Sequence, residues 1–163
     1  MNTSAIIAYL VVFTFSAIPL LEAFIVVPIG VLGGMNFLLT NIIGIAGNIL
    51  TLFIIIVMMD RIKRWYLRRR QRKGKGKSRQ SERAERIFKK YGVPGLGFFG
   101  PFIVGSHFAA LTAVILGGSQ KATFWWVTLS VIVSTVTISI LIQFGVDIIG
   151  VDDLRFLNRY LDQ

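Results

Sequence analysis

A single carboxylate between two prolines restricts the fold of this chain more than any other feature. Glu22 is the only charged residue between Ala5 and Gly34, and it lies between Pro19 and Pro28. Proline removes a backbone donor and interrupts the hydrogen bonds of a helix. A carboxylate in hydrocarbon costs several kcal/mol unless it faces protein or water. We therefore expect the chain to bend here around a polar pocket at membrane depth.

The composition indicates that this bend belongs to an integral membrane protein. Hydrophobic residues make up 54% of the 163-residue chain, and the mean hydropathy of +0.68 is far above that of a soluble domain. Four apolar stretches follow one another, alternately broken by proline and glycine and unbroken: residues 5–34, 36–59, 92–118 and 122–146. The unbroken stretch 36–59 would form a helix about 36 Å long, enough to cross a bilayer.

The alternation of broken and unbroken stretches suggests an internal duplication. Leu32-Gly33-Gly34 ends the first broken stretch, and Leu116-Gly117-Gly118 ends the second. The matched pattern of interruption is a stronger signal than these two short triplets. We predict an all-α integral membrane protein of two inverted repeats, each a broken re-entrant helical hairpin followed by a transmembrane helix.

Two membrane topologies are compatible with this pattern. In the inverted topology, each broken stretch leaves the membrane on the side from which it entered, only the unbroken stretches cross, and both termini lie outside. In the other, all four stretches cross and both termini lie inside. The distribution of Lys and Arg does not separate the two. We favour the inverted topology because dipping segments need such breaks.

Basic residues are concentrated between the two halves. Residues 61–90 contain fifteen of the 18 lysines and arginines, and Ile87, Phe88 and Tyr91 would share one face of a short amphipathic helix there. Nucleic acid could bind such a run. Because the run directly follows an uncharged span, we predict a cytoplasmic linker at a lipid surface and no nucleic-acid partner.

These patterns predict four segments and a location. The segments are a first membrane repeat (1–60), a basic cytoplasmic linker with an amphipathic helix (61–90), a second membrane repeat (91–146) and an interfacial amphipathic tail (147–163). The chain is expected to be a multi-pass protein of the cell membrane with membrane lipids as partners. Four apolar stretches enclose little space, so we also expect a homo-oligomer.

Glu22 is the first candidate for a functional group. Intramembrane ionisable side chains usually have a function, and a desolvated carboxyl can exchange a proton near neutral pH. The structural alternative is a carboxylate that caps broken backbone or lies near the surface. His107, the only histidine, lies in the broken region of the second half. It could form a proton relay with Glu22, or it could simply bond to freed backbone.

Other candidates lie at or near the breaks. Gly105 and Ser106 could expose backbone N–H groups to an anion at the start of a half-helix. Pro19, Pro28 and Pro101 would shape the polar site together with Asn48, although polar residues of the unbroken stretches more often bond helix to helix. The full set of predicted substrate- and proton-binding residues is Glu22, His107, Pro19, Pro28, Pro101, Gly105, Ser106 and Asn48.

The sequence offers little for enzyme chemistry. There is no cysteine and one histidine, which makes a structural zinc site improbable. The glycine-rich and histidine motifs that bind nucleotides or catalytic zinc are missing. We therefore expect no enzymatic activity, no cofactor and no metal.

At these residues the chain resembles the small multidrug export protein family, a relative of the DedA-like (SNARE-associated, VTT) membrane superfamily. The family spaces a proline, a glutamate and a second proline as Pro19, Glu22 and Pro28 are spaced here. Further matches are Leu32-Gly33-Gly34, Gly47-Asn48, Tyr91-Gly92, Pro101 to Gly105 and Leu116-Gly117. Many members follow the glutamate with Arg-Gly, whereas this chain has Ala23-Phe24.

The resemblance implies paired re-entrant segments and a transport role. The predicted function is proton-coupled movement of a small amphipathic or anionic substrate. The wider superfamily implies a first alternative, a translocase of polyprenyl phosphate or phospholipid. A second alternative is a membrane scaffold that transports nothing and whose basic linker binds partners or anionic lipid.

Overall fold

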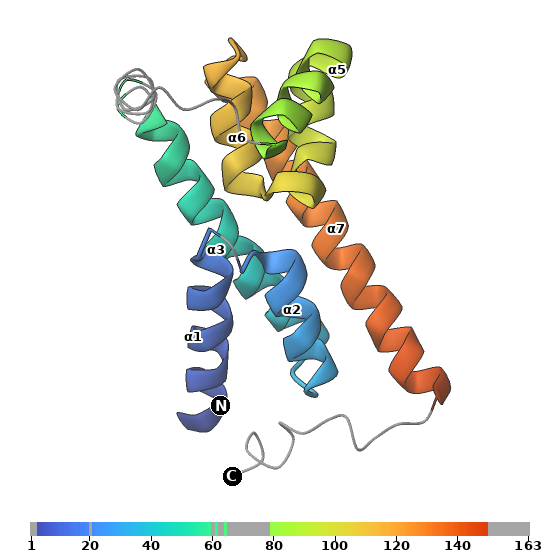
Figure 1. Cartoon of the computed structure of the whole chain (residues 1–163). Coiled ribbons are helices and arrows are strands. Elements are labelled where there is room, and N and C mark those ends of the chain that lie inside the picture. The colour runs from blue at the N-terminus through green and yellow to red at the C-terminus, as the bar shows by residue number, and fades with distance from the viewer. Residues whose placement is uncertain (1–2, 20, 60, 62–63, 65–78, 150–163) are drawn as a thin grey trace. The chain divides into compact units, whose positions relative to one another are not determined.

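The structure is a computed structural model that describes residues 3–19, 21–59, 61, 64 and 79–149 (Figure 1). Most of the predicted linker and residues 150–163 of the predicted tail lie outside the described residues. Within the described ranges the chain is helical and contains no strand, which confirms the all-α prediction. The helices are α1 (Thr3–Ala17), α2 (Ala23–Leu32), α3 (Phe37–Val57), α5 (Arg79–Val104), α6 (Ser106–Ile115) and α7 (Gln120–Ile149).

Two of these helices have the length and apolar character of membrane spans. They are α3, and α7 over Gln120–Gly145, and they coincide with the two stretches that the sequence predicts to be unbroken. Neither contains a proline, so the backbone bonds of each helix are complete within it, as hydrocarbon requires.

The chain forms two compact units. The first contains Met1–Leu50 and Val131–Gln163, and the second contains Thr51–Ser130, so α3 and α7 each run through both. These two units do not test the four segments expected from the sequence, which stay a prediction.

In the first unit, α1 and α2 run in opposite directions and contact each other (Figure 1). The chain reverses over residues 18–22, where the carbonyl of Ile18 accepts the N–H groups of Leu21 at 3.1 Å and Glu22 at 3.5 Å. Helix α3 lies so close to α1 that a side chain at Gly47 would collide with the backbone oxygen of Phe13. The predicted bend in the first apolar stretch is therefore present.

In the second unit, α5 bends once and then pairs with α6. Gly92 interrupts α5 with φ 66° and ψ −155°, a conformation that glycine adopts most readily. This is where the sequence predicts the amphipathic helix to end. Leu96 and Ala113 form a buried core against which Ile87 and Phe88 pack, so the apolar face of the amphipathic segment is used inside the unit.

Pro19 lies in the turn between α1 and α2, whereas two other prolines of the broken stretches lie inside helices. Pro28 lies inside α2 and Pro101 inside α5, whereas the chain reverses at residues 18–22 and at Gly105. A proline removes only one helical hydrogen bond, and a helix in a membrane protein continues through it when neighbours satisfy the freed carbonyl. The breaks therefore lie within the stretches that the sequence predicts to be broken, but at Glu22 and Gly105 and not at these two prolines.

The same local backbone geometry occurs in both halves, 83 residues apart. Glu22 (φ 38°, ψ 149°) precedes α2, and Gly105 (φ 89°, ψ 150°) precedes α6, and both helices have 10 residues. Two residues after the end of each helix lies a glycine with positive φ, Gly34 at 98° and Gly117 at 104°. In each case the N–H of this glycine bonds to a carbonyl three residues earlier, at 3.0 and 3.2 Å.

The start of the following long helix is also matched. The side chain of Asn36 accepts the N–H of Leu39 at 3.0 Å, and the side chain of Ser119 accepts the N–H of Ala122 at 3.2 Å. Both are N-terminal caps. The spacing is again 83 residues, so the two Leu-Gly-Gly triplets compared in the sequence are one residue out of register.

We expect Gly117→Ala to destabilise the protein more than Gly145→Ala. A Cβ would have open space at both positions, but only Gly117 has positive φ, where an L-residue costs roughly 1–2 kcal/mol. Gly145 lies in helix α7, where alanine is preferred by up to about 1 kcal/mol. Thermal unfolding in detergent should show a lower midpoint for Gly117→Ala alone, and equal midpoints would contradict the assigned backbone geometry.

Candidate functional site

Glu22 occupies an unusual backbone position at the start of α2. Its φ of 38° is the only positive φ of a non-glycine residue among the described residues, and its side chain is only 2% exposed. The side chain makes no capping hydrogen bond to α2. The carbonyl of Glu22 instead begins the helix by accepting the N–H groups of Ile25 and Val26, both at 3.1 Å.

Both properties of Glu22 cost free energy. A non-glycine residue in such a backbone region costs about 1–3 kcal/mol, and a buried carboxylate has lost its water. The equivalent position in the second half holds Gly105, which adopts the same conformation without strain. A glutamate here is therefore poorly explained by folding, whereas an observed outlier of this kind supports a functional hypothesis.

The backbone contributes to the electrostatic surroundings of Glu22. The N-terminus of α2 places partial positive charge beside this residue. The sequence from Met1 to Met59 contains no Lys, Arg or His, and Glu22 is its only charged residue. No charged side chain of residues 1–59 can therefore neutralise the carboxylate.

Asn48 and Ser16 form a polar contact within the same unit. Asn48 is fully buried, and its Nδ2 donates to the backbone oxygen of Ser16 at 3.3 Å. The hydroxyl of Ser16 is also buried and has no hydrogen-bond partner. Sequence analysis predicted Asn48 but missed Ser16, although a hydroxyl in the last turn before a proline-containing break could have indicated it.

The two prolines of the first half differ in their environment. Pro28 is buried within α2, whereas Pro19 is exposed in the turn between α1 and α2. Pro28 has no N–H to donate toward the carbonyl of Phe24. Of the first-half residues expected at the site, Glu22, Pro28 and Asn48 are therefore buried, and Pro19 shapes the turn from outside.

His107 lies in the first turn of α6 between two hydroxyl groups. Its Nε2 is 3.1 Å from Oγ1 of Thr51 on α3, and its Nδ1 is 3.1 Å from Oγ of Ser106. His107 is 5% exposed and Ser106 is fully buried. A neutral imidazole has one donor and one acceptor nitrogen, so this arrangement can pass a proton from one hydroxyl to the other.

The break before α6 brings four predicted residues together. Gly105 donates its N–H to the carbonyl of Pro101 at 3.0 Å, Pro101 is buried, and Ser106 and His107 follow directly. Thr51 was missed, because an isolated threonine in an apolar stretch usually bonds to its own helix. Glu22 belongs to the first unit and His107 to the second, and the relay between them stays a prediction.

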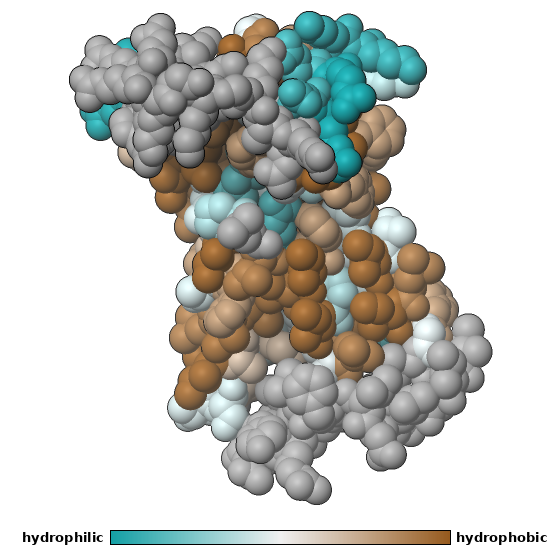
Figure 2. Space-filling view, viewed as in Figure 1, coloured by the Kyte–Doolittle hydropathy of each residue, from teal (hydrophilic) through white to brown (hydrophobic). Residues whose placement is uncertain are grey.

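The amphipathic segment of α5 presents charge to the surface. Its exposed basic residues are Arg83, Arg86, Lys89 and Lys90, and Figure 2 shows hydrophilic residues gathered over the start of α5. Lys89 forms an ion pair with Glu85 at 3.2 Å. A side-chain hydrogen bond with Tyr91 raises the pKa of Lys90 above its usual value, so this ammonium stays charged at physiological pH.

Metal chemistry has no visible basis in the described part of the chain. Among residues 3–19, 21–59, 61, 64 and 79–149, no group of three or more His, Asp or Glu side chains lies close enough to hold an ion.

Helices α3 and α7 are long and apolar enough to cross a membrane. Residues 22–137, more than two thirds of the chain, match the model of the family described as "Putative small multi-drug export protein". The chain belongs to this family, which confirms the resemblance inferred from the sequence. Comparisons with curated proteins and with solved structures gave no match.

We expect Thr51→Val to lower the free energy of unfolding by about 1 kcal/mol, because it removes a hydrogen-bond partner from a buried imidazole. Thr14→Val is the matched control, since Thr14 is exposed and bonds only to the carbonyl of Leu10 in its own helix at 2.7 Å. Equilibrium unfolding in detergent measures both. Equal effects of the two substitutions would show that the Thr51–His107 contact contributes nothing.

Proposed function

We propose that this protein is a proton-coupled transporter in which Glu22 binds the coupling proton. The observation that carries this proposal is the position of Glu22, which is buried at 2% exposure with a φ of 38°, while glycine stands at the equivalent backbone position of the second half. The cost of a strained backbone and of a buried carboxylate is usually retained only where the carboxylate has a function. The export role in the family description is consistent with transport.

His107 is the proposed second proton-binding group. Its two ring nitrogens both contact hydroxyl groups, so a proton can enter on one side and leave on the other by tautomer exchange. In this mechanism the carboxyl of Glu22 and the imidazole change protonation as a small amphipathic substrate passes the ends of α2 and α6.

We propose that the two halves are inverted repeats with re-entrant hairpins. The support is the matched pair of breaks, Glu22 and Gly105, and the matched helix ends at Gly34 and Gly117. Helices α1, α2 and α6 have only 10 to 15 residues, too few for a typical membrane span. The two matched breaks also favour a homo-oligomer, because a second copy would enclose the polar sites that a single chain leaves open.

Reporter tags at both termini test this topology. We expect both termini outside the cytoplasm and a tag inserted between Gly74 and Gly76 inside it, because hairpins that re-enter contribute no net crossing. The measurement is protease or fluorophore accessibility in spheroplasts. Two cytoplasmic termini would contradict the re-entrant arrangement and favour four crossings.

A lipid-phosphate translocase is the second candidate function. The exposed basic side chains of α5 at Arg83, Arg86 and Lys90 favour it, since they could attract anionic headgroups to the protein. The same residues would serve a membrane scaffold without transport activity. Purified protein in liposomes separates these functions by whether it moves a labelled polyprenyl phosphate, a cationic amphiphile or neither.

We expect Glu22→Gln to abolish proton-coupled transport in proteoliposomes, because glutamine keeps the shape of the side chain and cannot bind a proton. Glu82→Gln, which neutralises an exposed acid on α5, is the matched control and should leave transport unchanged. Transport by Glu22→Gln with an unaltered dependence on pH would refute the coupling role.

We expect Glu22→Gly to separate function from stability. Glycine adopts a φ of 38° without strain, so the free energy of unfolding should stay constant or rise by about 1–3 kcal/mol, while transport is lost. The measurements are thermal unfolding and proteoliposome transport on the same preparation. A large loss of stability would indicate that the carboxylate is there for folding.

A further inference from the structure

Three buried hydroxyl groups lie along one face of α7. They belong to Thr128, Thr135 and Ser139, whose side chains are 6%, 0% and 0% exposed. Their spacing of seven and four residues places them in one row on a helix, called the hydroxyl row below. At 1.5 Å per residue the hydroxyl row is about 16 Å long, which is about half the thickness of the hydrocarbon core of a bilayer.

The hydroxyl row makes no hydrogen bond to any described part of the chain. Other hydroxyl groups of α7 do: Ser134 donates to the carbonyl of Val131 at 3.1 Å. Ser130 donates to the carbonyl of Phe98 on α5 at 2.6 Å. A serine or threonine in an apolar helix usually bonds in one of these two ways, to its own helix or to a neighbouring one. The hydroxyl row is therefore not explained by bonds within or between helices.

The first unit contains further buried polar atoms of this kind. The hydroxyl of Ser16 on α1 and Oδ1 of Asn41 on α3 are buried and have no hydrogen-bond partner among the residues that the structure describes. Both residues belong to the same compact unit as Thr135 and Ser139. A buried polar group without a partner destabilises the folded state, and ordered water usually satisfies such groups where protein does not.

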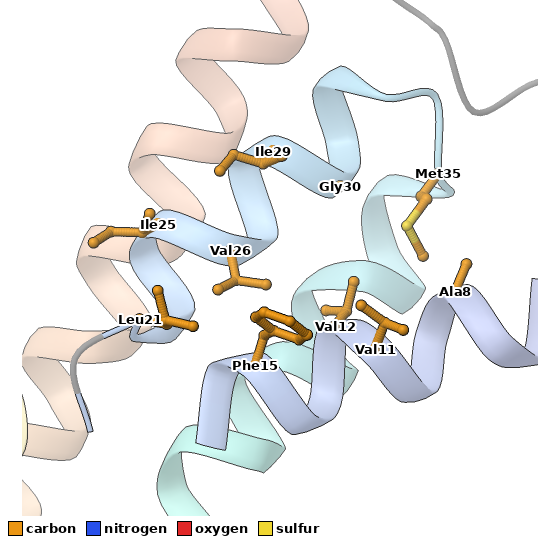
Figure 3. Close-up of a pocket in the computed structure, with 10 residues that line it drawn as sticks. All are labelled: Ala8, Val11, Val12, Phe15, Leu21, Ile25, Val26, Ile29, Gly30 and Met35. Atoms are coloured by element: carbon orange, nitrogen blue, oxygen red, sulfur yellow. The ribbon is translucent and has the colours of Figure 1, made fainter. Parts of the chain in front are cut away.

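The apolar groove of this unit offers these polar groups nothing. It lies between α1 and α2 and has a volume of about 430 Å³ (Figure 3). Its lining residues, among them Val12, Phe15 and Ile29, all have apolar side chains or none, and no hydroxyl or amide side chain lines it. An apolar cavity stays dry. The groove therefore suits hydrocarbon, and water that serves the buried polar groups must lie elsewhere in the unit.

We propose that a file of ordered water molecules lies along the hydroxyl row and forms a hydrated path along α7. A hydroxyl both donates and accepts hydrogen bonds, so each member of the row can hold a water in either orientation. Side chains four residues apart on a helix are about 5–6 Å apart, a separation that one bridging water spans.

The path is electrically neutral. Helix α7 carries no charged residue between Lys121 and Asp147, so the hydroxyl row offers hydrogen bonds and no fixed charge. Protons can move along such a file from water to water. Its role as the route of the coupling proton rests on the transport function proposed above, whereas the hydration of α7 does not and can be tested separately.

Single cysteine substitutions test the hydration, because the chain contains no cysteine of its own. Silver ions are small enough to enter a file of waters, and they react with the thiolate, which forms in water but poorly in apolar surroundings. In proteoliposomes we expect Thr135→Cys and Ser139→Cys to react at least about tenfold faster than Val133→Cys, since the thiolate fraction in hydrocarbon is lower by that factor or more. The measurement is the loss of labelling by a fluorescent maleimide after denaturation.

Two control positions on α7 separate hydration from exposure and from burial. Val133 lies two residues from Thr135, at a similar depth but on the opposite face, and is 43% exposed. Val127 is fully buried and apolar. Both Val133→Cys and Val127→Cys should react slowly, because the first would face lipid and the second is packed inside the protein.

Thermal unfolding in detergent provides a test that needs no cysteine. Thr135→Val keeps the shape of the side chain and removes its hydroxyl. If waters bind there, they lose a partner, and the unfolding midpoint should be lower than that of Thr137→Val, which removes an exposed hydroxyl from the same helix. An equal or higher midpoint for Thr135→Val would show that the hydroxyl is buried dry and would overturn the path. This comparison decides if a cysteine variant fails to fold.

The outcomes also separate the path from the proposed function. Thiols of the hydroxyl row that react as slowly as Val133→Cys overturn the path, and so does equally fast reaction at all positions, which would place water on every side of α7. If only the row reacts fast but Glu22→Gln transports with normal pH dependence, the path stands and the coupling role of Glu22 fails. An unreactive row together with lost coupling in Glu22→Gln refutes the path alone.

Discussion

The structure depends on a chain reversal that is completed inside an apolar protein. At both breaks a residue with positive φ, Glu22 or Gly105, starts a short helix, and its N–H bonds to a carbonyl four residues earlier. Backbone groups buried away from water need a hydrogen-bond partner within the protein. The reversal therefore has to be made by local bonds, and it turns the start of each short helix toward the interior of its unit.

Similar backbone geometry in the two halves supports different side-chain chemistry. In the first half the left-handed position carries a carboxylate, and the nearby polar groups are amide and hydroxyl. In the second half glycine occupies this position without backbone strain. The ionisable side chain there is His107, whose ring nitrogens contact the hydroxyl groups of Thr51 and Ser106. The two halves thus present different polar groups at equivalent backbone positions.

The sequence predicted the helical class, the unbroken spans and the burial of Glu22 and His107, because apolar patterning and isolated ionisable residues in apolar stretches are local signals. It located the breaks only to within a stretch of about ten residues, since a proline such as Pro28 can lie within a helix whose missing bond the surrounding protein tolerates. It missed Thr51 and Ser16, because their roles arise from contacts with residues distant in sequence, and a hydroxyl in an apolar stretch looks the same in either role.

The central claim is that Glu22 is a buried carboxyl that exchanges its proton as the protein works. Infrared difference spectroscopy of the reconstituted protein between acidic and basic pH tests this most directly, through the C=O stretch of a protonated carboxylic acid in an apolar site. We predict a band that titrates with transport activity and is absent from Glu22→Gln. A spectrum unchanged by that substitution would contradict the account.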